Sequence, residues 1–290
     1  MARTYNDLYM DLRQELRRAG IGAATLEAKE LVCFASGKTQ EQLLADGRLY
    51  APESVVRTAE ELKRRHLAGE PVAYLIGEWS FYGLDLDISE AVLIPRTDTE
   101  VLAEHAIDYV RELGECRVLD LCSGSGCVGL AIAANCPGAH VTLGEVSDGA
   151  LRIMRQNIRR TALTGRVAAV NIDARKTPER GLGDFHCIVC NPPYIPSGDI
   201  AELDVSVRDY EPRLALDGGE DGLDFYRDIV GKWGAALAKN GKLCFEVGIG
   251  QADAVLRLMR SAGFGDLVIV KDTGGIQRVV SGRLCETLEA

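Results

Sequence analysis

Residues 118–133 read VLDLCSGSGCVGLAIA, an apolar run followed by a loop of small residues and a second apolar run. The first run predicts a buried strand that ends near Asp120, and the second predicts a helix. Gly124 and Gly126 let the loop backbone approach a ligand closely, next to the positive N-terminus of that helix. Nineteen residues after Gly126 comes Glu145, at the end of the next predicted strand. Because its carboxylate can accept both hydroxyls of a ribose, this order predicts an adenosine cofactor.

Strand-like and helix-like patterns alternate around this stretch. Apolar and β-branched runs predict strands at 117–121, 140–145, 168–173, 186–191 and 242–248. Helical runs separate most of them, centred near residues 127–135, 148–163 and 223–239. This alternation predicts an α/β fold: a doubly wound, mostly parallel, seven-stranded Rossmann-like sheet. Two β-rich runs flank Thr273-Gly274-Gly275, a hairpin signature, so the final strand is expected to run antiparallel.

Residues 1–70 predict a small helical domain that precedes the sheet. Leu8, Leu12 and Leu16 recur at helical spacing, and Gly20 ends that run. Three more helical runs follow, and the domain contains no catalytic constellation. We therefore expect it to recognise a substrate rather than to carry the chemistry.

Residues 71–96 predict a β-hairpin that links this domain to the cofactor-binding domain at 97–290. Apolar side chains partly alternate between Trp79 and Ile88, with a turn at Gly83.

Two pairs of residues have the spacing of a helix capping box. Thr39 with Gln42 predicts the start of the third helix of the small domain. Thr97 with Glu100 predicts the start of a helix that runs to about Leu113.

Composition limits the classes of function. The chain has 290 residues, enough for about two domains, and no apolar run approaches the roughly 18 residues of a membrane span. We expect a cytoplasmic monomer. The net charge of −10 disfavours a surface that binds long nucleic acid stably. Cys187 and Cys190 form a C-x-x-C, but residues three apart on a strand face opposite sides, so free thiols are expected and no metal.

The glycine loop alone does not name the cofactor. Gly124, Gly126 and Gly129 also satisfy the dinucleotide fingerprint G-x-G-x-x-G, so an NAD-dependent oxidoreductase is a genuine alternative. Asp120 weighs against it, because a buried carboxylate repels a pyrophosphate. The same carboxylate suits the ammonium group of a methionine moiety, which favours S-adenosyl-L-methionine.

A second motif, IVCNPPYIP at residues 188–196, ends the fourth predicted strand, at the edge where open α/β sheets bind ligands. Its two prolines remove N–H donors and leave the Asn191 side-chain oxygen and the Pro192 carbonyl as acceptors. Tyr194 adds a flat aromatic face. Those acceptors can hold both N–H groups of a planar –NH2, so the motif predicts methyl transfer to an amide or exocyclic amine nitrogen. A rigid turn without catalytic meaning is the alternative.

With these motifs the chain resembles the class I methyltransferases that carry a (D/N)-P-P-(Y/F/W) motif. It is more closely similar to the bacterial release-factor glutamine N5-methyltransferases. The resemblance extends over nearly the whole chain, including EPVAYLIGEWSFYGLDL at 70–86, LIPRTDTE at 93–100 and EPRLALDGGEDGLDFYRDI at 211–229. DNA adenine methyltransferases share only the shorter motifs.

The resemblance implies transfer of a methyl group from S-adenosylmethionine to the side-chain amide nitrogen (N5) of a glutamine. That glutamine belongs to the Gly-Gly-Gln motif of peptide-chain release factors. Within the same class, a ribosomal-protein glutamine or a nucleic-acid amine is the alternative target. A binding module that keeps the fold without catalysis is a further alternative.

The resemblance also implies a set of site residues. The cofactor residues are Asp120, Cys122, Ser123, Gly124, Ser125, Gly126, Glu145, Asp173, Ala174 and Asn191. The substrate residues are Asn191, Pro192, Pro193, Tyr194 and Phe81, of which Asn191, Pro192 and Tyr194 are catalytic. The segment around Arg96 borders the same pocket. The chain departs from the family at Cys122, where a glycine is usual, and at Thr97, where a proline is usual.

Overall fold

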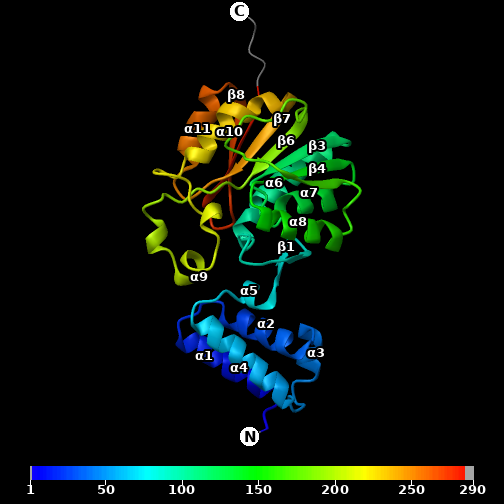
Figure 1. Ribbon diagram of the computed structural model, residues 1–290, viewed down its shortest axis with the longest axis vertical. Coiled ribbons are helices and arrows are strands. Elements are labelled where there is room, and N and C mark those ends of the chain that lie inside the picture. Colours follow the sequence, from blue (N-terminus) through cyan, green and yellow to red (C-terminus); the bar gives the residue numbers. More distant parts are fainter. Residues whose placement is uncertain (1, 285–290) are drawn as a thin grey trace, which may run out of the picture. The chain divides into compact units, whose positions relative to one another are not determined.

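The computed structural model describes residues 2–284, which fall into two compact units (Figure 1). One unit contains the chain up to Glu78 together with Val205–Tyr210, and the other contains Trp79–Asp204 and the chain from Glu211 onward. The backbone therefore passes between the units three times. Among the described residues, no helix combines the length and hydropathy that a membrane crossing requires.

The first unit is helical. Its helices are α1 (Tyr5–Arg18), α2 (Ala24–Ser36), α3 (Gln40–Ala45), α4 (Glu53–Leu67), α5 (Val72–Ile76) and the short α9 (Val205–Arg208). Leu8, Leu12 and Leu16 are fully buried, as their spacing predicts. The capping box between Thr39 and Gln42 is confirmed.

The short α9 segment, which is distant in sequence, packs on the end of α4. A Cβ placed on Gly69 would lie 2.8 Å from Val205 Cγ1 and 3.5 Å from Tyr210 Cε2, so a glycine is needed at this contact. The sequence analysis did not anticipate that Val205–Tyr210, which follow the motif Asn191–Tyr194 (NPPY) in the sequence, complete the helical unit. The division into a recognition domain at 1–70, a linker at 71–96 and a cofactor domain at 97–290 stays a prediction of roles.

The second unit opens with the predicted hairpin. Strands β1 (Glu78–Phe81) and β2 (Leu84–Asp87) form a two-stranded sheet. Tyr82 and Gly83 both have positive φ, 49° and 76°, as the tight hairpin turn requires.

The large sheet has seven strands in the order β5-β4-β3-β6-β7-β9-β8. The strands are β3 (Cys116–Leu121), β4 (Ala139–Glu145), β5 (Val167–Asn171), β6 (Phe185–Cys190), β7 (Leu237–Glu246), β8 (Phe264–Lys271) and β9 (Gln277–Leu284). Neighbours from β5 to β7 pair in parallel, and β9 pairs antiparallel with both β7 and β8. The predicted doubly wound sheet with an antiparallel final strand is confirmed.

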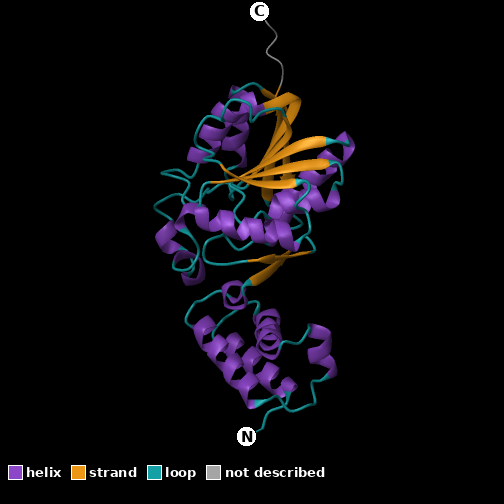
Figure 2. Cartoon of the chain, turned by 45° about the vertical axis from the view of Figure 1, so that its right-hand side comes forward, coloured by secondary structure: helices purple, strands orange, loops and turns teal. Residues whose placement is uncertain are grey.

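Helices cover both faces of this sheet (Figure 2). One face carries α6 (Glu100–Leu113), α7 (Cys127–Asn135) and α8 (Asp148–Arg160), and the other carries α10 (Asp224–Lys232) and α11 (Ala252–Ser261). The chain leaves β3 towards β4 on one side and resumes with β6 on the other. The strand order therefore reverses beside β3, which is where such sheets form a ligand crevice.

One predicted capping box is wrong. Thr97–Thr99 forms a 3-10 turn, and α6 begins at Glu100 without a side-chain cap. The Glu100 carboxylate instead accepts a hydrogen bond from the Tyr82 amide at 2.9 Å, so it holds the hairpin turn. The Tyr82 amide, which is distant in sequence, therefore takes the place of the Thr97 amide as the donor to the Glu100 carboxylate.

The third glycine of the loop motif sets how closely α7 packs on the sheet. A Cβ on Gly129 would lie 2.2 Å from Leu143 Cδ2, and the Gly129 amide donates to Asp120 Oδ2 at 2.9 Å. Helix α7 can approach β3 and β4 at this distance because position 129 has no side chain.

We expect Gly129→Ala to lower the free energy of unfolding by about 1–3 kcal/mol, because the added methyl overpacks the contact with Leu143. Urea denaturation measures this. The matched control is Gly231→Ala in α10, where a Cβ meets no atom within 4 Å. That control should stabilise by about 0.5–1 kcal/mol. Equal stability of the two variants would contradict this account of the packing.

Candidate active site

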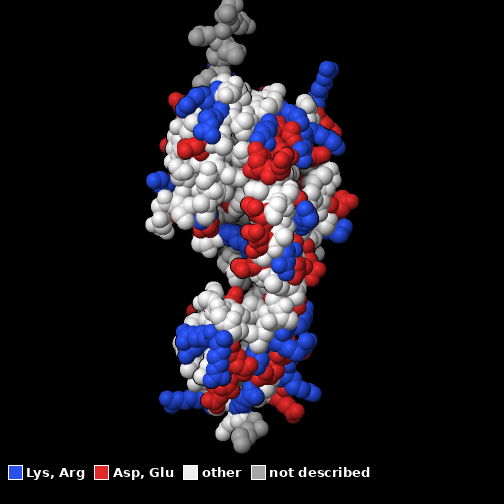
Figure 3. Space-filling model, turned by 90° about the vertical axis from the view of Figure 1, so that its left-hand side faces the viewer, with Lys and Arg blue, Asp and Glu red and all other residues white. Residues whose placement is uncertain are grey.

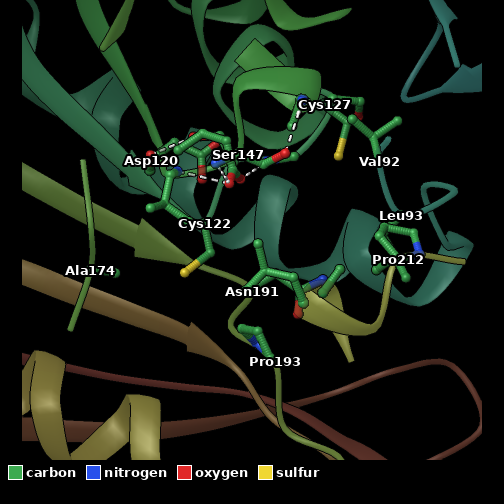
Figure 4. A pocket seen from close by; sticks show the side chains of 18 of the residues that line it. Val92, Leu93, Asp120, Cys122, Cys127, Ser147, Ala174, Asn191, Pro193 and Pro212 are labelled. Carbon is green, nitrogen blue, oxygen red and sulfur yellow. Dashed lines mark hydrogen bonds between the residues drawn. The ribbon is translucent and has the colours of Figure 1, made fainter. Parts of the chain in front are cut away.

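A cavity of about 380 Å³ lies at the carboxyl ends of β3, β4 and β6 (Figure 4). Most of the residues expected to bind a cofactor line it: Asp120, Cys122, Ser123, Gly124, Ser125, Glu145, Asp173, Ala174 and Asn191. Pro193, expected to bind substrate, and Arg96 line it too. The structure therefore brings the glycine loop, Glu145 and the loop Asn191–Tyr194 (the NPPY loop) to one cavity.

Four of the expected residues do not line this cavity. Gly126 caps α7 with φ 83° and donates its amide to Ser123 O at 2.7 Å. Phe81 is 1% exposed, so it belongs to the core rather than to the wall. Pro192 is buried, and the Tyr194 hydroxyl donates to Glu246 Oε1 at 3.4 Å. The Tyr194 phenol is thus engaged with β7 in this structure.

Glu145 organises the loop that it faces. Its Oε2 accepts from the Gly124 amide at 3.0 Å, and its Oε1 accepts from the amides of Val146 and Ser147 at 2.8 and 2.9 Å. An ionised carboxylate can accept about four hydrogen bonds. Glu145 therefore retains capacity for one ligand hydroxyl, and holding both ribose hydroxyls requires one backbone bond to lengthen.

Asp120 is a buried carboxyl at the end of β3. It is 2% exposed and accepts from the Gly129 amide. Burial raises its pKa to about 7, although the bond from Gly129 opposes that rise. A cation placed beside Asp120 would favour the ionised form. This group is therefore poised to respond to a ligand ammonium.

Cys122 adopts φ 56°, in the left-handed region that favours glycine. The loop therefore has the backbone conformation expected for a glycine at this position, although the residue is a cysteine. Its side chain packs against the core that contains Cys190, the residue before Asn191. Figure 4 shows Cys122 and Asn191 on the wall of the same cavity. Burial, together with a hydrogen bond to Cys122, raises the pKa of the Cys190 thiol.

The other cysteine of the C-x-x-C has a different partner. A hydrogen bond with Cys244 and burial raise the pKa of Cys187. Cys187 and Cys190 are both fully buried, consistent with thiols that face opposite sides of β6. Within residues 2–284, no group of three or more His, Cys, Asp or Glu side chains could hold a metal ion.

The end of the cavity around Ala174 is largely apolar. Ala174 is buried, and its carbonyl accepts the Trp233 indole N–H at 2.9 Å, which fixes this part of the wall. Ile172 and Phe225 flank it. Asp173 already accepts the Arg175 amide at 3.0 Å and keeps its second oxygen near Lys176.

Segments distant in sequence hold the NPPY loop. Ile195 exchanges backbone hydrogen bonds with the segment at Leu216 and Gly218, at 3.0 and 2.9 Å. A Cβ on Gly218 would lie 2.8 Å from Pro193 O, so only a glycine fits there. The Gln251 amide donates to Tyr194 O at 2.9 Å. The sequence patterns did not identify Leu216, Gly218 and Gln251 as residues that hold the NPPY loop. The family resemblance did include the segment 211–229, which contains the first two.

An ion pair between a buried carboxylate and a partly exposed guanidinium joins two more segments that are distant in sequence. Glu211 is 6% exposed, accepts from the Ile94 amide at 3.3 Å and pairs with the Arg96 guanidinium. Arg96 itself lines the cavity, where it borders a largely apolar wall. The residues of that wall that the sequence analysis did not identify are Ala91, Val92, Leu93, Pro95, Pro212, Leu214 and Ala215.

Comparisons with known proteins show the family of the chain. Residues 7–77 match the PrmC N-terminal domain, and residues 97–206 match the methyltransferase small domain. The release factor glutamine methyltransferase of Geobacter sulfurreducens is 40% identical over 280 residues, which cover 94% of each chain. The chain belongs to the release factor glutamine methyltransferase family.

Other members of the release factor glutamine methyltransferase family match over a similar span. The enzyme of Thermodesulfovibrio yellowstonii is 35% identical and covers 88% of this chain and 90% of its own. Among solved structures, the catalytic domain of hMettl16 in complex with a MAT2A 3′UTR hairpin covers 71% of this chain and 77% of its own. It aligns with a TM-score of 0.56 at 18% identity, a likeness that shows the fold alone.

We expect the binding of S-adenosylmethionine at pH 7 to release protons. A ligand ammonium beside Asp120 lowers a pKa that burial has raised to about 7, so the carboxyl ionises on binding. Affinity should consequently weaken as the pH falls below 7. Calorimetric titration in two buffers of different ionisation enthalpy measures the released protons.

Asp120→Asn is the control for this titration, because it keeps the shape of the side chain and removes its ionisation. The variant should bind more weakly and release fewer protons. If it releases as many protons as the wild type, the titrating group is not Asp120.

Proposed function

We propose that this enzyme transfers a methyl group from S-adenosylmethionine to the side-chain amide nitrogen of the glutamine in the Gly-Gly-Gln motif of peptide-chain release factors. The observation that supports this most directly is the position of Asn191. It lies on the wall of the cavity that the glycine loop and Glu145 also line. The relatives, which are release factor glutamine methyltransferases, supply the substrate class.

The cavity fits the cofactor in size and in chemistry. Its volume of about 380 Å³ lies in the range of about 300–1,000 Å³ that holds small-molecule ligands. Glu145 stands where a ribose hydroxyl would be recognised, and Asp120 stands where an ammonium would be compensated. The apolar stretch formed by Ile172, Ala174 and Phe225 suits the purine ring.

The NPPY loop suits an amide acceptor. When bound, S-adenosylmethionine supplies an electrophilic methyl group. An amide nitrogen is a weak nucleophile because its lone pair is delocalised into the carbonyl. Asn191 Oδ1 and the Pro192 carbonyl would accept the two N–H bonds, increase electron density on the nitrogen and orient it. The transferred methyl makes the nitrogen acidic, so the proton is lost to water without a dedicated base.

We further propose that the helical unit recognises the protein substrate and that the enzyme works where release factors act, in the cytoplasm. A monomer is sufficient for this, because one chain carries all the named site residues. Nucleic acid is a less suitable target for a chain of net charge −10. On the face that Figure 3 shows, acidic and basic side chains are intermixed rather than gathered into a basic band.

The direct test supplies radiolabelled S-adenosylmethionine to the purified enzyme with four acceptors: a release factor, its Gly-Gly-Gln glutamine→alanine variant, ribosomal proteins, and RNA. Label should enter the intact release factor alone. Label in ribosomal protein or RNA but not in the release factor would overturn the proposed substrate. A parallel calorimetric titration with NADH, which should show no binding, tests the oxidoreductase alternative.

We expect Asn191→Ala to lower the rate of transfer by about 10²–10³-fold, the usual effect of removing one oriented group from an active site. The fold should persist, as measured by urea denaturation. Asn171→Ala is the matched control, because Asn171 is exposed at the end of β5 and does not line the cavity. Full activity of the Asn191 variant would exclude this mechanism.

A further inference from the structure

One aromatic side chain lines the active-site cavity. It is Phe225, in the first turn of α10, and among the described residues that form the cavity wall no other side chain is aromatic. Arg175, which follows Ala174 in the sequence, lies over its ring, so Phe225 belongs to the end of the cavity around Ala174. An aliphatic side chain would supply apolar surface equally well, whereas only a flat ring can stack on a purine.

Two kinds of contact hold the Phe225 ring. The side chain packs against the core that contains Tyr226 and Trp233. The Arg175 guanidinium lies over the ring, with its Cζ 5.4 Å from the ring centroid, which is within the range of a cation–π contact. Because the protein itself makes both contacts, the ring is already placed before a ligand binds, and little conformational entropy is lost on binding.

Arg175 is anchored through both its side chain and its backbone. Its Nε donates to Asp228 Oδ2 at 2.8 Å, and its Nη2 lies 3.6 Å from Asp224 Oδ2. Its backbone amide donates to Asp173 Oδ1 at 3.0 Å, and its carbonyl accepts from Lys232 Nζ. The N–H bonds of a guanidinium lie in its plane, so pairing with carboxylates leaves its flat face for an aromatic ring.

The residues that place Arg175 follow from the sequence of α10. Asp224 and Asp228 are four positions apart, so their side chains lie on one face of the helix. Both carboxylates pair with the Arg175 guanidinium, and Phe225 follows Asp224 directly. The same helical turn therefore carries the ring and the anions that hold the cation over it.

We propose that Phe225 is the platform on which the adenine of S-adenosylmethionine stacks, and that Arg175 is a positioning residue that holds this ring through the cation–π contact. The inference rests on the proposed function, because it assumes a cofactor that carries an adenine. Glu145 and Asp120 then account for the ribose and the ammonium, and Phe225 accounts for the base.

The first experiment measures the calorimetric affinity for S-adenosylmethionine of Phe225→Leu and Phe225→Tyr. Leucine keeps an apolar side chain without a ring, so affinity should fall by about fivefold to a hundredfold, the usual effect of losing a stack between a base and an aromatic ring. Tyrosine keeps the ring and should retain most of the affinity. The control is Phe34→Leu in α2, because Phe34 is exposed and does not line the cavity. Its affinity should equal that of the wild type.

A second ligand assigns the loss to the base. 5′-Methylthioadenosine carries the adenine and the ribose but has neither the ammonium nor the carboxylate of the methionine moiety. Phe225→Leu should weaken its binding by the same factor as that of S-adenosylmethionine. Asp120→Asn, in contrast, should weaken the binding of S-adenosylmethionine alone.

A double-variant cycle tests the role of Arg175. Arg175→Met should weaken binding by about twofold to fivefold, and Arg175→Lys, which keeps the cation, should recover part of that loss. In the Phe225→Leu background Arg175→Met should have no further effect, because its ring partner is gone. Arg117→Met is the matched control. It removes a cation–π contact with Phe185 at 4.8 Å, outside the cavity wall, and should leave the affinity unchanged.

The outcomes separate this inference from the proposed function. If the wild type neither binds S-adenosylmethionine nor methylates a release factor, the proposed function fails and the inference fails with it. If the wild type does both and Phe225→Leu keeps full affinity, only the inference is overturned. A loss in Phe225→Leu that is absent with 5′-methylthioadenosine would also overturn it, since the base would not be the group concerned. An equal effect of Arg175→Met with and without the Phe225 ring would remove the positioning role of Arg175.

Discussion

The hydrogen bond between the Gly129 amide and the Asp120 carboxyl joins α7 to the end of β3, and the active site depends on it. The bond, 2.9 Å from the Gly129 nitrogen to Asp120 Oδ2, can form because Gly129 has no side chain to separate the helix from Leu143. That approach brings the start of α7 and the glycine loop beside Glu145. The same bond places Asp120 in a buried setting, where its ionisation becomes sensitive to a nearby cation.

Much of the fold could be predicted from the sequence, because its determinants are local. Helical spacing at Leu8, Leu12 and Leu16, the capping box at Thr39 and the alternation of strands and helices each reflect neighbouring residues. Thr97 with Glu100 has the same local pattern as Thr39 with Gln42, yet it does not cap a helix. The difference is the Tyr82 amide, which only the tertiary structure brings to Glu100.

Some residues of the candidate site could likewise be predicted from local sequence patterns, and others could not. Asp120, Glu145 and Asn191 could be named because each follows a predicted strand, and parallel strands end at one edge of a sheet. The supports of the NPPY loop could not, because Gly218, Glu246 and Gln251 come from distant segments that become neighbours on folding. Phe81 and Tyr194 show a further limit, since residue type does not reveal which way a side chain points.

The six residues from Val205 to Tyr210 bear on the modularity of the chain. A domain attached only at one end can be exchanged or lost without disturbing its neighbour. Here the helical unit is completed by a segment that lies inside the sequence of the other unit, against Gly69. The N-terminal residues alone are therefore an incomplete fold, and in the remaining chain Val205 and Tyr210 would lose their contact with the Gly69 segment. Recombination could exchange this unit only by replacing two separate stretches together, so the two units are constrained to evolve as a pair.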